Sequence, residues 1–262
     1  MTGTNKSLGQ HWLCDRDTLR RIAEFAKITG EDTILEIGPG LGTLTSELLK
    51  NSKKVVAVEF DGDLARKLPG QFPGKNLEVV AGDILEFDLS QLPNGYKVVA
   101  NVPYYITSKI VHTLMTAKNK PSMVVLLVQK EVAQRLAARP GNMSILSISA
   151  QVFAKVTLGD VIPAKLFVPP PKVDSQVVVF RMLPEPLVSS ANQINFFRVV
   201  KAGFSAKRKK LRSSLAGGLK LPKPEIEKLL HNANISPDVR AETLTIADWI
   251  RLTDVLSKQQ VY

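Results

Sequence analysis

The amino-acid sequence predicts an α/β fold: a mostly parallel sheet of seven strands, followed by a small all-helical domain. Apolar, β-branched runs recur along the first two thirds of the chain, and they are continuous, as in strands that are buried on both faces. Amphipathic segments with helical periodicity separate several of these runs, as the crossover connections of a parallel sheet require. After residue 184 the helical periodicity continues, and no convincing strand remains.

Seven segments have the length and composition of strands. They are residues 33–38, 54–61, 76–84, 97–104, 122–129, 155–162 and 175–182. A proline-rich loop instead of a helix separates the last two, so we expect them to form an antiparallel hairpin at one edge of the sheet. A helix is predicted before the first strand, where Asp15 or Asp17 can cap its N-terminus and Gly30 can end it.

The composition of the chain changes after the last predicted strand. The segment "LPEPLVSSANQ" (183–193) contains two prolines and several small polar residues, which is typical of a linker. We therefore expect one domain over residues 1–183 and a second, helical domain over residues 184–262.

The charge of the chain points to a polyanionic partner. The formal net charge is +11 and the pI is about 9.7. The segment 198–212 holds seven basic residues and no acidic one, and such clustering favours binding to nucleic-acid phosphates. The alternative is a solvated basic surface that serves only solubility, and the clustering argues against it.

The sequence predicts a cytoplasmic protein without a membrane span. No apolar run approaches the roughly 20 residues that cross a bilayer. The N-terminal segment "MTGTNKSLGQHW" lacks the apolar core of a secretory signal and the amphipathic form of a transit peptide. Cys14 is the only cysteine, so no intrachain disulfide is possible, and its spacing suggests no zinc site.

Chemistry-bearing residues follow the predicted strands, where open parallel sheets bind their ligands. Gly38, Gly40 and Gly42 follow the first strand and let the backbone approach a ligand closely. Glu59 ends the second strand, where a carboxylate can accept both hydroxyls of a ribose. Asp83 follows the third strand and is placed to meet an adenine amino group.

These residues predict a cofactor that contains adenosine. A dinucleotide fingerprint that starts at Gly40 would need Gly or Ala where Thr45 stands, so a pyrophosphate-containing cofactor fits poorly. S-adenosylmethionine (SAM) fits the pattern, and NAD fits it less well. A glycine-rich turn alone is also compatible with a plain strand-to-helix connection.

The fourth strand ends in "NVPY" (101–104), which has the residue types of a clamp for an amino-bearing base. An exocyclic adenine amine is a poor nucleophile, so it must be held about 3–3.5 Å from the methyl donor, with its N–H groups on acceptors. The Asn101 side-chain oxygen and the carbonyl of Val102 or Pro103 can accept them. Tyr104 can stack on an extruded base. Without other motifs, a turn with an Asn cap and two tyrosines at the edge of the core would be the favoured explanation, because Asn-x-Pro-Tyr alone is a short motif.

Eight segments together resemble one family, the KsgA/Dim family of small-subunit ribosomal RNA adenine N6,N6-dimethyltransferases, over essentially the whole chain. The segments are "KSLGQHWL" (6–13), "LEIGPGLGTLT" (35–45), "AVEFD" (57–61), "GDIL" (82–85), "NVPYYITS" (101–108), "LLVQKEVAQRLAARPG" (126–141), "FVPPPKVDSQVVVF" (167–180) and "FSAKRKKLRSSL" (204–215). The related 23S-directed methyltransferases share the core motifs. The first and seventh segments are more similar to the small-subunit branch.

The resemblance implies a Rossmann-like class I SAM methyltransferase domain over residues 1–183 and a helical RNA- and ribosome-recognition domain over residues 184–262. It implies transfer of methyl groups from SAM to the N6 amino groups of two adjacent adenines near the 3′ end of small-subunit (16S) rRNA, during subunit biogenesis. The expected partner is this rRNA within an assembling 30S-type subunit. We expect a monomer that needs no metal.

The resemblance also assigns roles to residues, position by position. The cofactor-binding residues would be His11, Leu13, Gly38, Glu59, Asp83 and Asn101. The catalytic residues would be Asn101, Pro103, Tyr104 and Phe167, with Phe167 stacking on the target base opposite Tyr104. The RNA-binding residues would be Lys207, Arg208, Lys209, Lys210 and Arg212.

Two other functions are compatible with parts of the sequence. One is a ribosome-assembly or transcription factor that binds RNA without turnover. Such a protein would not need Glu59, Asp83 and Asn101, so their presence argues against this function. The other is a nicotinamide-dependent oxidoreductase, which the glycine spacing and the basic cluster disfavour.

Overall fold

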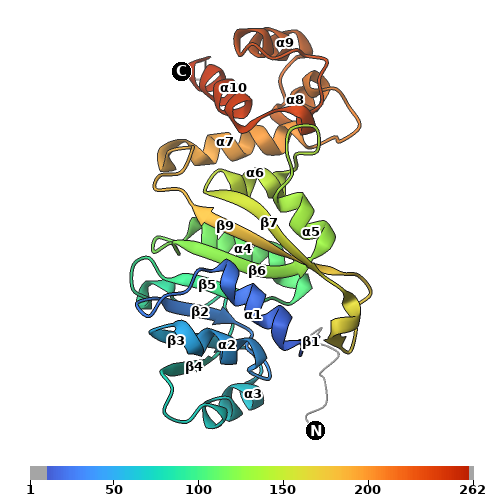
Figure 1. Cartoon of the computed structure of the whole chain (residues 1–262). Coiled ribbons are helices and arrows are strands. Elements are labelled where there is room, and N and C mark those ends of the chain that lie inside the picture. Colours follow the sequence, from blue (N-terminus) through green and yellow to red (C-terminus); the bar gives the residue numbers. More distant parts are fainter. Residues whose placement is uncertain (1–10, 260–262) are drawn as a thin grey trace. The chain divides into compact units, whose positions relative to one another are not determined.

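The computed structural model describes residues 11–259 of the chain, and these form two compact units (Figure 1). The first unit combines the residues up to 134 with residues 154–182, and the second combines residues 135–153 with the residues from 183 onward. Residues 135–153 were expected to belong to the domain over residues 1–183. Within the second unit, the N–H groups of Gly141 and Met143 donate to the carbonyl oxygen of Glu242, and these bonds attach the segment there.

The first unit contains the predicted sheet of seven strands, which confirms the α/β fold class. The strands are β2 (Thr33–Ile37), β3 (Lys54–Glu59), β4 (Leu77–Ala81), β5 (Lys97–Asn101), β6 (Met123–Gln129), β7 (Ala154–Ile162) and β9 (Ser175–Met182). Their order in the sheet is β4-β3-β2-β5-β6-β9-β7. The first five are parallel, and β9 pairs antiparallel with both β6 and β7. The predicted hairpin is thereby confirmed, with β7 at the edge.

The helices of this unit lie on both faces of the sheet, as the continuous apolar strands require. They are α1 (Arg16–Phe25), α2 (Thr43–Asn51), α3 (Gly62–Lys67), α4 (Thr107–Thr116) and the start of α5 (Lys130–Leu136). Figure 1 shows α1 and α2 on one side of the sheet and α4 on the other. The core between α1, α2 and the strands includes Leu19, Leu48 and Val99, each at most 3% exposed.

Helix α1 begins as predicted and ends earlier than predicted. The Asp15 side chain accepts a hydrogen bond of 2.9 Å from the N–H of Thr18 and caps the helix. The helix ends at Phe25, and Lys27 has a left-handed φ of 47°. The prediction that Gly30 ends the helix was wrong, because the left-handed turn at Lys27 stops it first.

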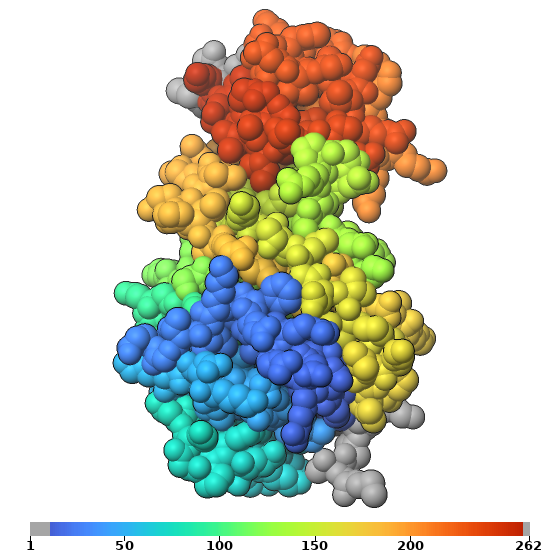
Figure 2. All heavy atoms as spheres, viewed as in Figure 1, coloured from blue at the N-terminus to red at the C-terminus, as the bar shows by residue number. Residues whose placement is uncertain are grey.

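A second, two-stranded sheet joins distant parts of the first unit, and the sequence analysis did not expect it. Strand β1 (Trp12–Leu13) pairs antiparallel with β8 (Phe167–Val168), with Leu13 opposite Phe167. Both side chains are buried, at 2% and 1% exposure. The space-filling view shows the N-terminal residues (blue) adjoining the residues before β9 (yellow) (Figure 2). This pairing places Trp12 and Leu13 beside the proline-rich loop, whereas residues 6–10 of the N-terminal motif lie outside the described residues.

The second unit is helical, as predicted for the chain after residue 184. Its helices are α6 (Ile145–Gln151), α7 (Ser190–Gly203), α8 (Leu211–Leu219), α9 (Lys223–Asn232) and α10 (Ile246–Gln259). Trp249 is fully buried among them and packs on Phe204, with ring centroids 5.7 Å apart. Within residues 11–259, no helix is long and apolar enough to span a membrane.

Candidate active site

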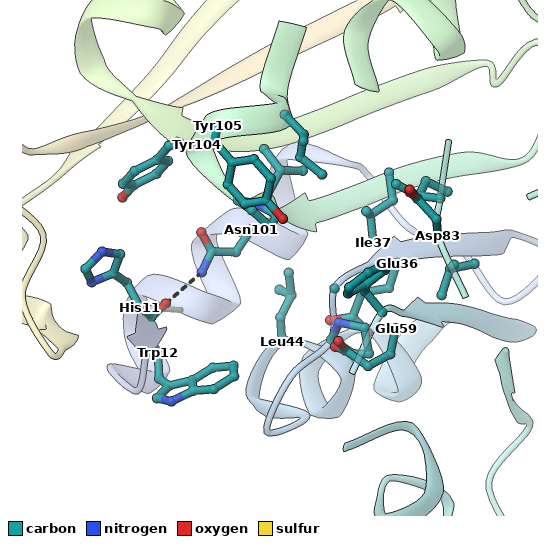
Figure 3. A pocket seen from close by; sticks show the side chains of 18 of the residues that line it. His11, Trp12, Glu36, Ile37, Leu44, Glu59, Asp83, Asn101, Tyr104 and Tyr105 are labelled. Atoms are coloured by element: carbon teal, nitrogen blue, oxygen red, sulfur yellow. Dashed lines mark hydrogen bonds between the residues drawn. The ribbon is translucent and has the colours of Figure 1, made fainter. Parts of the chain in front are cut away.

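The first unit contains a cavity of about 350 Å³ at the carboxyl ends of its parallel strands (Figure 3). Its wall includes Glu36 of β2, Glu59 of β3, Asp83 after β4 and Asn101 of β5. Strands β2 and β5 are neighbours in the sheet, and the chain order reverses between them. This reversal is where open α/β sheets bind their ligands, so the cavity is the candidate active site.

The glycine loop after β2 has left-handed backbone, and its first glycine, Gly38, lines the cavity. Gly38, Gly40 and Gly42 have φ values of 64°, 56° and 78°. A Cβ at Gly38 would enter open space on the cavity wall, so a ligand can approach the backbone there. A Cβ at Gly40 would lie 2.1 Å from the Trp12 ring. The loop therefore has room for a ligand at Gly38 and close packing at Gly40.

Glu59 is held rigidly at the end of β3. Its Oε2 accepts a hydrogen bond of 2.9 Å from the N–H of Gly40, and its Oε1 accepts one of 2.8 Å from the N–H of Asp61. The side chain is 6% exposed, and burial raises the pKa of the carboxyl, while these backbone donors oppose the rise. Each oxygen keeps a second lone pair, so the carboxylate can still accept two hydroxyl donors.

Asp83 lies on the same wall, beyond Glu59. Its Oδ1 accepts a hydrogen bond of 2.9 Å from the N–H of Leu85, which fixes the side chain. The N–H of Gly82 donates to the carbonyl oxygen of Glu59 over 2.9 Å and joins the ends of β3 and β4. The second oxygen of Asp83 is free to accept from an amino group. Glu59 and Asp83 thus offer acceptors for hydroxyls and for an amine, the donor groups of an adenosine.

Glu36 is a cavity residue that the sequence analysis missed. Its side chain is 1% exposed, and its Oε2 accepts a hydrogen bond of 2.6 Å from Thr45 Oγ1. Burial, with a smaller contribution from the charge of Glu59, raises the pKa of Glu36 to about 8. The sequence feature that could have identified Glu36 is an acidic residue inside an otherwise apolar strand. Thr45, which breaks the dinucleotide pattern, is the residue that satisfies this buried carboxyl.

Asn101 lies at the end of β5 and faces the cavity from the opposite side (Figure 3). Its Nδ2 donates a hydrogen bond of 3.4 Å to the carbonyl oxygen of His11. The amide oxygen is therefore the atom that can accept from a ligand. The Pro103 carbonyl oxygen accepts from Ile106 N–H at 3.3 Å and from Thr107 Oγ1 at 3.4 Å. Val102 is thus better placed than Pro103 to supply a second, backbone acceptor.

Tyr104 is half-buried at the cavity wall. Its hydroxyl lies 2.7 Å from Ser175 Oγ, and burial raises its pKa, while this hydrogen bond opposes the rise. Its ring stacks against the His11 ring, with centroids 6.0 Å apart and an interplanar angle of 22°.

The structure brings the expected cofactor-binding and catalytic residues together at one cavity, with the exception of Phe167. Leu13 lines the cavity, although it is buried, and its carbonyl accepts from Thr43 Oγ1 at 2.9 Å. Phe167 is 1% exposed, belongs to the hydrophobic core and does not line the cavity. The expected position of its ring opposite Tyr104 is therefore not what this structure has, because pairing with Leu13 directs it into the core.

Two exposed aromatic residues at the cavity were also missed. Phe60 is 64% exposed and Tyr105 is 66% exposed, and both line the cavity. Figure 3 shows the Tyr105 ring reaching over the cavity from the clamp side. Both could have been predicted as cavity residues, because they directly follow the expected site residues Glu59 and Tyr104. Among the described residues, no group of three or more His, Cys, Asp or Glu side chains could hold a metal ion.

The expected RNA-binding residues lie in the second unit and differ in their surroundings. Residues 207–209, here called the basic turn, are exposed and form no ion pair with the described residues. Lys210 pairs with Asp238 at 3.1 Å. Arg212 pairs with Asp238 at 3.2 Å and with Glu227 at 3.1 Å. Acidic partners therefore already neutralise these last two cations, which the sequence analysis grouped with the basic turn.

Comparison with known proteins identifies similar sequences along the whole chain. The family model "Ribosomal RNA adenine dimethylase" matches residues 1–258. A Ribosomal RNA small subunit methyltransferase A from Dehalococcoides mccartyi is 40% identical over 251 residues, which cover 94% of this chain and 86% of that protein. A protein of the same name from Clostridium botulinum is 38% identical, over 96% of this chain and 94% of its own length.

Solved structures agree with these sequence relationships. A dimethyladenosine transferase from Plasmodium falciparum superposes with a TM-score of 0.83 and 28% identity, over 95% of this chain and 98% of that one. The 23S rRNA methyltransferase ErmE superposes with a TM-score of 0.77 and 30% identity, over 94% of this chain and 99% of that one. The similarity to both covers the two compact units.

Proposed function

This chain belongs to the ribosomal RNA adenine dimethylase family, and we propose that it transfers methyl groups from SAM to N6 of two adjacent adenines near the 3′ end of small-subunit rRNA. It is a SAM-dependent adenine N6,N6-dimethyltransferase. The physiological substrate is this rRNA within an assembling subunit in the cytoplasm, and the enzyme acts there as a monomer. Neither alternative function, RNA binding without turnover or nicotinamide chemistry, accounts for this family membership.

The cavity residues suit SAM as the cofactor. The open space at Gly38 admits the methionine end, and the two Glu59 oxygens accept the ribose hydroxyls. The free Asp83 oxygen accepts from the adenine amino group, while His11 and Leu13 border the site. When bound, SAM supplies an electrophilic methyl group. The residues of the chain must then bring a nucleophilic nitrogen to it and keep it aligned.

Asn101 is the residue that prepares the nucleophile, and the proposal depends most on this observation. Its amide nitrogen is committed to the His11 carbonyl, so its Oδ1 accepts an N–H from the adenine amine. The Val102 carbonyl accepts the other N–H, and this pair of acceptors orients the nitrogen lone pair. As the amine becomes positively charged, both acceptors stabilise the charge. Tyr104, fixed by Ser175, supports the plane of the base.

The basic turn supplies the second part of the function, which is recognition of the rRNA. Its three side chains are exposed and form no ion pair within residues 11–259, so they can neutralise phosphates. Lys210 and Arg212 instead stabilise the start of α8 through Asp238 and Glu227. Among the five expected RNA-binding residues, RNA affinity therefore depends mainly on residues 207–209.

Labelled SAM and unmethylated small subunits test the proposed function. Wild-type enzyme should label adenine N6 in the rRNA, and mapping should find two neighbouring dimethyladenines near the 3′ end. Asn101→Ala should lower kcat by about 10²–10³-fold, the usual effect of removing one group that stabilises developing charge. SAM affinity should fall less than about tenfold, because only a long hydrogen bond to His11 is lost.

Asn51→Ala is the matched control, because Asn51 is exposed at the end of α2 and does not line the cavity. This variant should keep wild-type turnover. Wild-type turnover in Asn101→Ala would contradict the assignment of the clamp. A wild-type enzyme that labels no adenine would contradict the proposed function itself.

A further inference from the structure

The ring that faces Tyr104 in this structure is that of His11. Both side chains line the cavity, and their nearly parallel rings have centroids 6.0 Å apart (Figure 3). The residue expected in this position, Phe167, lies in the hydrophobic core. The two aromatic faces that border the target side of the cavity are therefore a tyrosine and a histidine.

Both rings are fixed by hydrogen bonds to other elements. Nδ1 of His11 lies 2.7 Å from the carbonyl oxygen of Pro169. A carbonyl only accepts, so Nδ1 carries a proton and donates, and this bond sets the ring plane. The Tyr104 hydroxyl is fixed by Ser175. The orientation of the two rings is thus set before any base arrives, which lowers the entropy cost of binding one.

The same residue also orients the clamp. The backbone carbonyl of His11 accepts the hydrogen bond from Asn101 Nδ2 that leaves the Asn101 oxygen available. A base beside the His11 ring would therefore have its amino group next to the acceptor that this residue positions. The His11 ring would contact the base, and the His11 carbonyl would orient the amide that binds the amino group of that base.

We propose that the rings of His11 and Tyr104 are the two walls of a slot that holds the target adenine. This inference rests on the proposed function. A planar base in contact with a ring on each side needs about 7 Å between the rings, which is two van der Waals contacts of about 3.5 Å. The two ring centroids are 6.0 Å apart, so the rings separate to admit the base. His11 is then a positioning residue for the RNA substrate, in addition to bordering the cofactor.

Three substitutions separate stacking from hydrogen bonding at this position. His11→Ala removes both, His11→Phe keeps an aromatic face, and His11→Asn keeps a donor for Pro169 without the face. His112→Ala is the control, because His112 is exposed in α4 and does not line the cavity. The measurements are kcat and KM with unmethylated small subunits and labelled SAM, and the Kd of SAM by calorimetry without RNA. Circular dichroism checks that each variant is folded.

If the slot exists, His11→Ala lowers kcat/KM for the subunit by about 10-fold or more, the loss typical of one aromatic stacking partner. His11→Phe stays within about threefold of wild type, and His11→Asn stays as low as His11→Ala. In His11→Ala and His11→Asn the Kd of SAM rises by a smaller factor than kcat/KM falls, because His11 also borders the cofactor. His112→Ala behaves as wild type.

Other results overturn the inference. Rescue by His11→Asn but not by His11→Phe would mean that the ring acts only through its hydrogen bond to Pro169. A rise in the Kd of SAM that accounts for the whole loss of activity would mean that His11 serves the cofactor alone. Normal activity in all three variants would mean that the ring has no role. If the wild-type enzyme labels no adenine, the proposed function is contradicted, and this result is distinct from a loss of activity in the His11 variants alone.

Discussion

Gly38→Ala should weaken SAM binding far more than it weakens folding. Gly38 has a φ of 64°, and its Cβ would enter the open space on the cavity wall. A non-glycine residue in this left-handed region costs about 1–2 kcal/mol, so the free energy of unfolding should fall by that amount. For a chain of this size, such a loss lowers Tm by about 2–8 °C. The new methyl group would occupy space that the cofactor needs, and the Kd of SAM should rise at least about tenfold.

Gly74→Ala provides the matched control for this experiment. Gly74 has a φ of 71°, its Cβ would also meet no atom within 4 Å, and it does not line the cavity. The two substitutions impose the same backbone strain, so they should lower the free energy of unfolding equally. Only Gly38→Ala should change the Kd of SAM.

Chemical denaturation and calorimetric titration with SAM measure the two quantities independently. Unchanged SAM affinity in Gly38→Ala would show that the cofactor does not approach this part of the glycine loop. Equal losses of affinity in both variants would show that the effect comes from general destabilisation. Either result would refute the assignment of the cavity wall at Gly38 to the cofactor.

Two further predictions concern charge. Replacing residues 207–209 by Gln should reduce the slope of log K against log salt for subunit binding by about 2–3, because each lost phosphate contact contributes about 0.7–0.9. Gln at Lys210 and Arg212 should leave the slope nearly unchanged and lower the free energy of unfolding by at most about 1 kcal/mol. An unchanged slope in the first variant would contradict the role of the basic turn. In the folded chain, the pKa of Glu36 is raised from 4.5 to about 8. Between pH 4.5 and about pH 8 the folded state therefore binds more protons than the unfolded state. The free energy of unfolding should fall as the pH rises through this range. Denaturation curves at several pH values should show this fall in the wild type but not in Glu36→Gln, and parallel pH profiles would mean that Glu36 is ionised throughout.

The residues that end the parallel strands were predictable from the sequence, and the reason is geometric. Parallel strands place their carboxyl ends at one edge of a sheet, so Glu59, Asp83 and Asn101 had to face a common region. The structure brings all three to one cavity. The glycine loop could also be predicted from the sequence, because left-handed backbone at three alternating positions favours glycine.

Contacts between segments far apart in the chain were decided only by the tertiary structure. Whether Phe167 faces the cavity or the core depends on its pairing with Leu13, which lies 154 residues earlier, and no local pattern specifies that register. The approach of His11 to Tyr104 depends on the same pairing of β1 with β8.

In the second unit, the ion-pair partners of the basic residues were likewise decided by the tertiary structure. A run of cations in the sequence shows how many positive charges a segment carries, and it does not show which acids fold against them. Lys210 and Arg212 meet Asp238 only because the segment that follows α9 returns to the start of α8. The sequence by itself therefore determined the fold class, the cofactor type and the strand-end residues, because these follow from local periodicity and from the geometry of parallel sheets. The tertiary structure decided which aromatic ring borders the target side and which cations stay free, because both depend on long-range pairing.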